Sequence, residues 1–121
     1  MILKPSIVTP GKSAAKASPE QVAEMTLRIL RRTVPAAVPS INFLSEGQTP
    51  EQASANLNAL NQLKANARWN LSFSYGRALQ ETALKASPGD PRNLEQAQAS
   101  FLKRARLNSW AQRGDYSTDQ E

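Results

Sequence analysis

Lys4 is the residue whose position best suits covalent chemistry. It ends a short apolar run, Met1 to Leu3, and Pro5 after it disfavours helical backbone at the lysine. A lysine at the end of a strand, flanked by apolar residues, can lose its hydration, which favours the neutral amine that attacks carbonyl groups. From position alone, however, an ordinary surface lysine is the more common interpretation.

Two short turns have residues suited to binding phosphate. They are Ser45-Glu46-Gly47-Gln48 and Ser74-Tyr75-Gly76-Arg77, and each lies between an apolar run and a helical pattern. Such turns expose backbone N–H groups to phosphate oxygens, Gly76 permits close approach, and Arg77 can bind phosphate in a bidentate manner. Ordinary turn formation, without any ligand, explains each motif about as well as phosphate binding does. The two turns follow Lys4 one after the other along the chain. Together with Lys4 they predict a lysine imine beside a phosphate site, and so a phosphorylated ketone or aldehyde as substrate.

The composition excludes several kinds of site. The 121 residues include no histidine and no cysteine, which argues against zinc sites, disulfides and Ser-His or Cys-His nucleophiles, so we expect no metal and no cofactor. No apolar run is long enough to span a bilayer, and residues 1–6 do not resemble a signal peptide, so no membrane partner is expected.

The net charge of +5 raises the alternative of nucleic-acid binding. Only two small basic groups occur, Arg28-Arg31-Arg32 and Lys103-Arg104-Arg106, and both lie on predicted helices. Cations near helix C-termini are favoured by the helix dipole, so we interpret both groups as solvated helix faces and expect no nucleic-acid partner.

A weak internal repeat organises the chain. Ser18-Pro19-Glu20-Gln21 and Thr49-Pro50-Glu51-Gln52 both predict a helix start with a capping box. Helices are expected over residues 19–33, 50–62, 77–86 and 91–113, and strands near 1–4, 41–45 and 71–74. Their expected buried residues are, in the first helix, Val22, Ala23, Met25, Leu27, Ile29 and Leu30; in the second, Ala53, Leu57 and Leu60; and in the last, Leu94, Ala97, Phe101, Leu102 and Ala105.

Strands that alternate with helices predict an α/β fold with a parallel sheet. Three strands complete neither a doubly wound sheet nor a (β/α)8 barrel, and they leave two edges and one face uncovered. The pattern therefore suggests part of a larger fold, and we expect the chain alone to be poorly soluble because of its open edges and apolar face. The domain is expected over residues 1–116 and a frayed tail over residues 117–121, with Tyr116 at the start of the fraying.

The sequence from Leu3 to Gly11, Leu-Lys-Pro-Ser-Ile-Val-Thr-Pro-Gly, resembles the segment around the Schiff-base lysine of class I fructose-bisphosphate aldolases. The similarity continues in order through residues 30–39, 43–45, 47–48, 56–61 and 73–80, and through Ala105, Asn108, Ser109, Ala111, Gln112 and Gly114. It implies a partial TIM (β/α)8 barrel, made of the last three βα units and a C-terminal helix. Lys4 would form the imine with the substrate, without a metal.

The resemblance also implies which residues bind phosphate. Ser45 and Gly47, with the backbone of Glu46, would hold one phosphate, and Ser74, Gly76 and Arg77 would complete the site. The family has Ser-Gly-Gly-Gln where this chain has Ser45-Glu46-Gly47-Gln48, so we expect charge repulsion and a costly positive φ at Glu46. Many members also end in a tyrosine that assists proton transfer, a place that Tyr116 does not occupy.

We therefore expect a fructose-bisphosphate aldolase segment that is inactive alone, because the family's acid-base carboxylates lie on earlier strands. Family members imply a homo-oligomer, a tetramer, in the cytoplasm, or in a plastid in a photosynthetic eukaryote. The alternative is a non-catalytic truncated product that acts as a basic helical interaction module.

Overall fold

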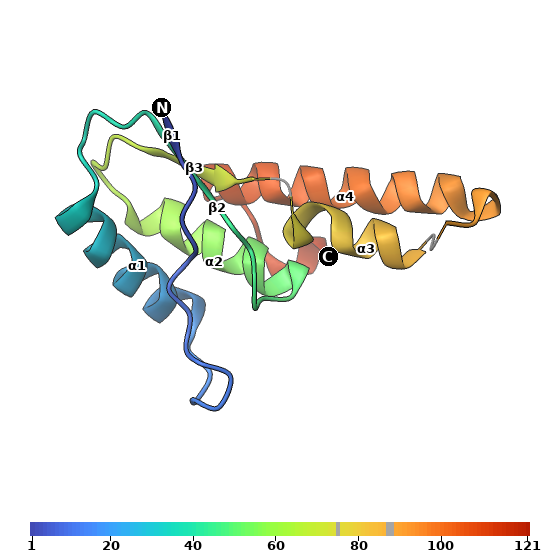
Figure 1. The fold of residues 1–121 in the computed structure, drawn as a ribbon, viewed down its shortest axis with the longest axis horizontal. Helices are drawn as coiled ribbons and strands as arrows, with labels where there is room; N and C mark the ends of the chain where they lie inside the picture. Colours follow the sequence, from blue (N-terminus) through green and yellow to red (C-terminus); the bar gives the residue numbers. More distant parts are fainter. Residues whose placement is uncertain (75, 87–88) are drawn as a thin grey trace.

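The computed structural model describes residues 1–74, 76–86 and 89–121, and Figure 1 shows their arrangement. Strands and helices alternate along this part of the chain, as predicted. The strands are β1 (Ile2–Leu3), β2 (Ser40–Phe43) and β3 (Asn70–Phe73). The helices are α1 (Pro19–Thr33), α2 (Pro50–Leu63), α3 (Arg77–Ala86) and α4 (Leu94–Arg113), with short 3-10 turns η1 (Pro91–Asn93) and η2 (Thr118–Gln120).

The three strands form one parallel sheet in the order β1-β2-β3, which confirms the predicted parallel arrangement. Leu3 lies opposite Ile41, and Ile41 lies opposite Leu71. Because all three strands run in the same direction, the segments that follow them gather at one edge of the sheet.

Both predicted capping boxes are present. The Ser18 side chain accepts a hydrogen bond from the Gln21 N–H, while the Gln21 side chain accepts one from the Ser18 N–H. Thr49 and Gln52 make the same pair of bonds at the start of α2. These bonds satisfy N–H groups that a helix start leaves without partners, and proline at the first helical position loses nothing there.

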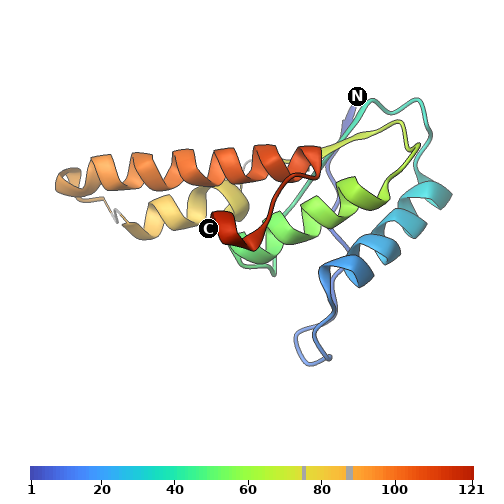
Figure 2. The ribbon, with the colours of Figure 1, turned by 180° about the vertical axis from the view of Figure 1, so that it is seen from behind.

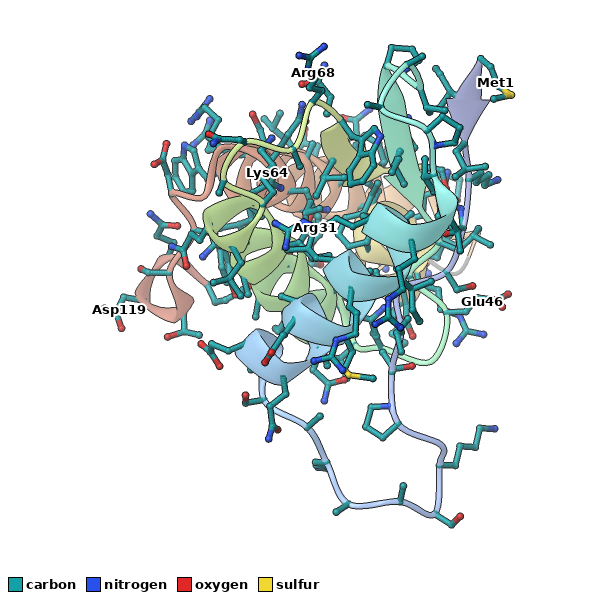
Figure 3. The ribbon with its side chains drawn as sticks, turned by 90° about the vertical axis from the view of Figure 1, so that its left-hand side faces the viewer. Met1, Arg31, Glu46, Lys64, Arg68 and Asp119 are labelled. Atoms are coloured by element: carbon teal, nitrogen blue, oxygen red, sulfur yellow. The ribbon has the colours of Figure 1, made fainter. Side chains whose placement is uncertain are left out.

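The core lies between the sheet and the helices on one of its sides (Figures 1 and 3). Ile41, Phe43 and Leu71 are fully buried on the helix side of the sheet. Alternate strand residues point to opposite faces, so the same face also carries Leu3 and Phe73. They pack with residues of α1 and α2 that include, as predicted, Val22, Ala23, Leu27, Leu30, Ala53, Leu57 and Leu60.

The opposite face of the sheet is not apolar, contrary to expectation. The alternation of side chains assigns Ser40, Asn42, Asn70 and Ser72 to this face, together with one apolar residue, the exposed Ile2. Ser40 donates a hydrogen bond to Asn42 Oδ1 at 2.7 Å. A polar open face binds water, so the expectation of poor solubility loses one of its two reasons, and only the open edges remain.

Two helices bury different residues from those predicted. On α1, Met25 and Ile29 are 44% and 43% exposed, because the buried stripe runs through Val22, Thr26 and Leu30. On α4, Leu94, Phe101 and Leu102 are exposed, because the first half of the helix projects beyond α2 (Figure 1). The second half packs on the core instead, through Arg104, Leu107, Asn108 and Ala111.

The segment after α4 is docked, so the prediction of a frayed tail was wrong. Gly114, with φ +80°, ends the helix. The chain then turns back and runs along α2 towards the N-terminus of α2 (Figure 2). Tyr116 is buried, and its N–H donates to Asn58 Oδ1 at 3.0 Å. This buried tyrosine ties the segment to α2.

Arg104 is the interior partner of this segment, so its basic group is not entirely a solvated face. The side chain of Arg104 is 3% exposed, and its Nη1 lies 2.6 Å from Glu121 Oε2. Glu121 also accepts a hydrogen bond from the Tyr116 hydroxyl at 2.8 Å. The prediction that Arg104 is solvated was wrong because the spacing of Lys103, Arg104 and Arg106 is typical of a basic surface group. Its partner Glu121 is distant in sequence, so the pattern around Arg104 does not reveal the pairing.

The burial and contacts of this cluster shift two pKa values. Burial, and then the hydrogen bond to Glu121, raise the pKa of Tyr116 well above its usual value. For Glu121, burial alone would raise the pKa, but the hydrogen bonds from Arg104 and Tyr116 and the charge of Arg104 outweigh it, so the net pKa is lowered. The carboxylate is therefore the form that the folded state favours.

The substitution Glu121→Gln should lower the free energy of unfolding by about 1–2 kcal/mol at neutral pH, because it removes a charged acceptor from Arg104. A lowered pKa in the folded state stabilises above the unfolded pKa, so the difference from wild type should vanish as pH falls through the folded pKa. Urea denaturation from pH 7 to pH 3 measures this. Asp119→Asn, on the outer side of the same turn (Figure 3), is the control and should have little effect at any pH; equal effects would contradict the assignment.

Candidate functional site

Lys4 lies directly after β1, at the edge where the strands end. Pairing with β2 continues past it, because the Leu44 N–H donates to the Pro5 carbonyl at 2.9 Å and Ser6 forms a bridge with Leu44. The backbone on both sides of Lys4 is thereby fixed. The register places Lys4 level with Asn42, on the polar face of the sheet. Its side chain is exposed, so the described residues do not remove its hydration as expected.

Ser45 joins the first turn to the second. Its side chain is buried, with the residue 4% exposed, and its Oγ accepts a hydrogen bond from the Ala78 N–H at 2.9 Å. Ala78 lies in the first turn of α3, where N–H groups lack partners within the helix. Since a hydroxyl both accepts and donates, Ser45 keeps its proton for another acceptor.

Gly47, not Glu46, has the left-handed backbone in the first turn. Its φ is +76°, and among the described residues Ala65 is the only non-glycine residue with a positive φ. The expected conformational cost at Glu46 therefore does not arise. Glu46 is exposed and lies at the rim of the molecule (Figure 3), which leaves only its charge as an obstacle to an anion.

The second turn begins with Ser74, whose N–H and hydroxyl both donate to the Phe43 carbonyl, at 3.0 and 3.1 Å. These bonds tie the end of β3 to β2. A Cβ placed on Gly76 would meet only Ser45 Oγ, at 3.8 Å, so the protein itself leaves room for a side chain at this position. Arg77 follows as the first residue of α3 and is exposed, while Tyr75 lies outside the described residues.

Residues of both turns face a common cleft of about 540 Å³, which Gly47 and Arg77 line together. Its other charged groups are Glu51, Glu81 and Lys85, and Lys85 pairs with Glu81 at 2.9 Å. Lys4 does not line this cleft in the described structure. It follows β1, the strand next to β2, and neighbouring strands lie roughly 4.8 Å apart. The structure thus brings the two turns into contact and places Lys4 one strand away at the same edge.

The sequence did not reveal the polar residues behind these turns. Ser54 is fully buried and donates to Asn108 Oδ1 at 2.7 Å, and Asn108 Nδ2 donates to the Ala78 carbonyl at 2.9 Å. Beside them, Asn56 Nδ2 donates to Gln48 Oε1 at 2.7 Å. The available signal was the run of polar residues at helical spacing in α2, which includes Ser54, Asn58 and Asn61 on its buried side.

In the part of the chain that the structure describes, no group of three or more acidic residues could hold a metal ion. No described helix is both long and apolar enough to cross a bilayer.

Comparisons with known proteins agree on one family. The family model described as "Fructose-bisphosphate aldolase class-I" matches residues 1–121. "Fructose-bisphosphate aldolase 6, cytosolic" of Arabidopsis thaliana is 55% identical over 118 residues, which are 98% of this chain and 33% of that protein. A non-muscle aldolase of Lethenteron camtschaticum is 54% identical, with 95% of this chain and 32% of that protein covered. The chain thus spans about a third of the length of these relatives.

A solved structure gives the same result. It is a fructose-bisphosphate aldolase from Plasmodium falciparum in complex with TRAP and a small-molecule inhibitor. The match has a TM-score of 0.90 at 46% identity and covers 96% of this chain and 33% of that one. The three-stranded parallel α/β arrangement described above is therefore the fold of one third of an aldolase chain.

The substitution Glu46→Gln should tighten the binding of inorganic phosphate about fivefold at low salt, because it removes a like charge that costs roughly 1 kcal/mol near the anion in water. Titration of the chain with phosphate, followed through backbone amide NMR shifts, measures the affinity. The gain should shrink as salt rises. Glu20→Gln, at the start of α1, is the matched control; an equal gain there would show a nonspecific charge effect.

Proposed function

Since the chain belongs to the class I fructose-bisphosphate aldolase family, we propose that it supplies the imine-forming lysine and a phosphate site of a fructose-bisphosphate aldolase. Such an enzyme cleaves fructose 1,6-bisphosphate reversibly to dihydroxyacetone phosphate and glyceraldehyde 3-phosphate. The observation that carries the proposal is the hydrogen bond from Ala78 to Ser45, which joins two phosphate-suited turns at the edge where Lys4 follows β1.

Lys4 performs the covalent step. Its neutral amine attacks the ketone carbon of the sugar, and loss of water leaves a protonated imine. The imine accepts the electron pair of the carbon–carbon bond as that bond breaks, while a base removes the proton of the neighbouring hydroxyl. This leaves an enamine, which takes a proton at the carbon where the bond broke and so becomes the imine again, and hydrolysis of that imine returns the lysine. The base and the groups that desolvate Lys4 belong to strands outside residues 1–121, so the chain alone is inactive.

The two turns hold the phosphate of the imine-forming half of the sugar. Ser45 donates its hydroxyl proton, and the backbone of Glu46 and Gly47 offers N–H groups at a turn with left-handed geometry. In the second turn, Gly76 leaves room for the phosphate to approach the backbone closely, and Arg77 supplies a cation. Ser74 fixes the strand end from which this second turn starts.

The architecture we propose for the complete enzyme is a (β/α)8 barrel, with β1 to β3 as three neighbouring strands and the polar face of the sheet inside. Active sites of such barrels lie at the carboxyl ends of the strands, where Lys4, Ser45 and Ser74 lie here. The names of plant relatives, one cytosolic and one cytoplasmic, support a location in the cytoplasm. A homotetramer is the assembly that the family resemblance implies.

The alternative of a non-catalytic basic helical module has no observation in its favour among the described residues. One of its two basic groups contains Arg104, whose charge is buried and paired with Glu121. The remaining cations of these groups are dispersed on exposed helix surfaces. The proposal therefore rests on the site at the strand ends.

The test joins residues 1–121 to the N-terminal two thirds of the Arabidopsis aldolase, so that the barrel is complete. Borohydride reduction with dihydroxyacetone phosphate should leave a covalent adduct on Lys4, located by mass spectrometry, because only an imine is trapped. Lys4→Arg keeps the charge and should abolish both adduct and cleavage. Lys12→Arg, in the loop after β1, should leave both unchanged. An adduct that persists in Lys4→Arg would refute the role of Lys4.

A further inference from the structure

Ala78 is held by side chains at both of its backbone polar groups. Its N–H donates to Ser45 Oγ and its carbonyl accepts from Asn108 Nδ2, each at 2.9 Å. A carbonyl in the first turn of a helix already has a partner one turn later, so the bond from Asn108 is not needed to form α3. It ties the first turn of α3 to α4, directly behind the residue that contacts Ser45.

The orientation of the Asn108 amide is set by its neighbours. Arg104 can only donate, and one of its nitrogens donates to Ser54 Oγ and to the Pro50 carbonyl. For the proton of Ser54, the nearer acceptor is Asn108 Oδ1, at 2.7 Å, and the Pro50 carbonyl lies at 3.1 Å. This leaves Asn108 Nδ2 to face the Ala78 carbonyl. A rotated amide would place Asn108 Oδ1 against the Ala78 carbonyl, which can only accept, so this carbonyl fixes the orientation of the amide.

The series runs through the interior. Arg104 is 2%, Ser54 0% and Asn108 7% exposed. Buried polar groups cost stability unless all of them are satisfied, and apolar residues of similar volume would pack such a core with less risk. A polar series here accordingly suggests a positional role, and the place that it positions is the first turn of α3, with Arg77 at its start.

We propose that Asn108 is a positioning residue for phosphate binding: through Ala78 it fixes the first turn of α3, and with it the Ser45 hydroxyl and the base of Arg77. The inference rests on the proposed function, because it assumes that phosphate binds at this turn. Asn108 does not touch the phosphate. It acts by keeping the donors of two separate turns at one fixed spacing.

The chain contains a matched control in Asn61. This residue is also buried, at 9% exposure, and its Nδ2 donates to the carbonyls of Leu57, Leu71 and Ala111. It therefore joins α2, β3 and α4 as Asn108 joins α2, α3 and α4, but none of these bonds reaches α3. A purely structural role for Asn108 predicts that the two residues behave alike towards phosphate.

The experiment compares Asn108→Leu with Asn61→Leu in the full chain, by amide NMR, with inorganic phosphate as the probe. Asn108→Leu should weaken phosphate binding about fivefold, the fold-change expected for the loss of one hydrogen bond, and should speed hydrogen exchange at the Ala78 amide. Asn61→Leu should change phosphate affinity less than about twofold, whatever its effect on stability. Ser54→Ala, a smaller change at a fully buried site, gives the same test if Asn108→Leu does not fold.

Equal weakening by the two asparagine variants would overturn the inference, as would an unchanged Ala78 amide in Asn108→Leu. Either result, with a wild-type chain that binds phosphate, leaves the proposed function in place. If the amides of residues 76–78 do not respond to phosphate in the wild-type chain, the proposed phosphate site is wrong and this inference is rejected with it.

Discussion

In a parallel sheet all the strands end at the same edge, and this constraint determines where the chemistry of this chain can lie. β1, β2 and β3 pair in sequence order, with Leu3, Ile41 and Leu71 in one row on the core side. Slipping β1 by one residue would move Lys4 from the polar face to the helix side, since alternate residues point to opposite faces. The buried row thus fixes the face on which the lysine lies.

The second requirement is that the turns after β2 and β3 stay together. Strands β2 and β3 end at Phe43 and Phe73, and past the backbone bond from the Ser74 N–H to the Phe43 carbonyl the turns are held by side chains. Ser74 bonds back to Phe43, and Ser45 bonds forward to Ala78. Ser45 keeps its hydroxyl proton for a ligand, whereas both donors of Ser74 are used within the protein, and Asn108 supports the contact of Ser45 with Ala78 from behind. The phosphate-suited turns are held by the same interactions that begin α3.

Local signals in the sequence predicted the elements well. The capping boxes at Ser18 and Thr49 fixed two helix starts, because a cap depends on residues within one turn. What depends on distant residues was missed. The exposure of Leu94 and Phe101 follows from how far α4 projects past α2, and the burial of Arg104 follows from a carboxylate 17 residues away. Periodicity alone reports neither.

The candidate site divides in the same way. The positions of Lys4, Ser45 and Ser74 at the strand ends follow from the strand pattern, and the structure agrees with it. The left-handed φ at Gly47 rather than Glu46 follows the usual preference of glycine for positive φ, whereas the polar residues behind α3 could not be predicted because they depend on how α2, α3 and α4 pack.

The central claim is that one edge of the sheet holds both an imine lysine and the phosphate of the same substrate. A crystal structure of the completed barrel, reduced with borohydride in the presence of dihydroxyacetone phosphate, tests this directly. We expect a covalent bond to Lys4 Nζ, with the phosphate within hydrogen-bond distance of the Ser45 hydroxyl and the backbone N–H groups of residues 46–47 and 76–77. A phosphate bound away from these two turns, or an adduct on another lysine, would contradict it.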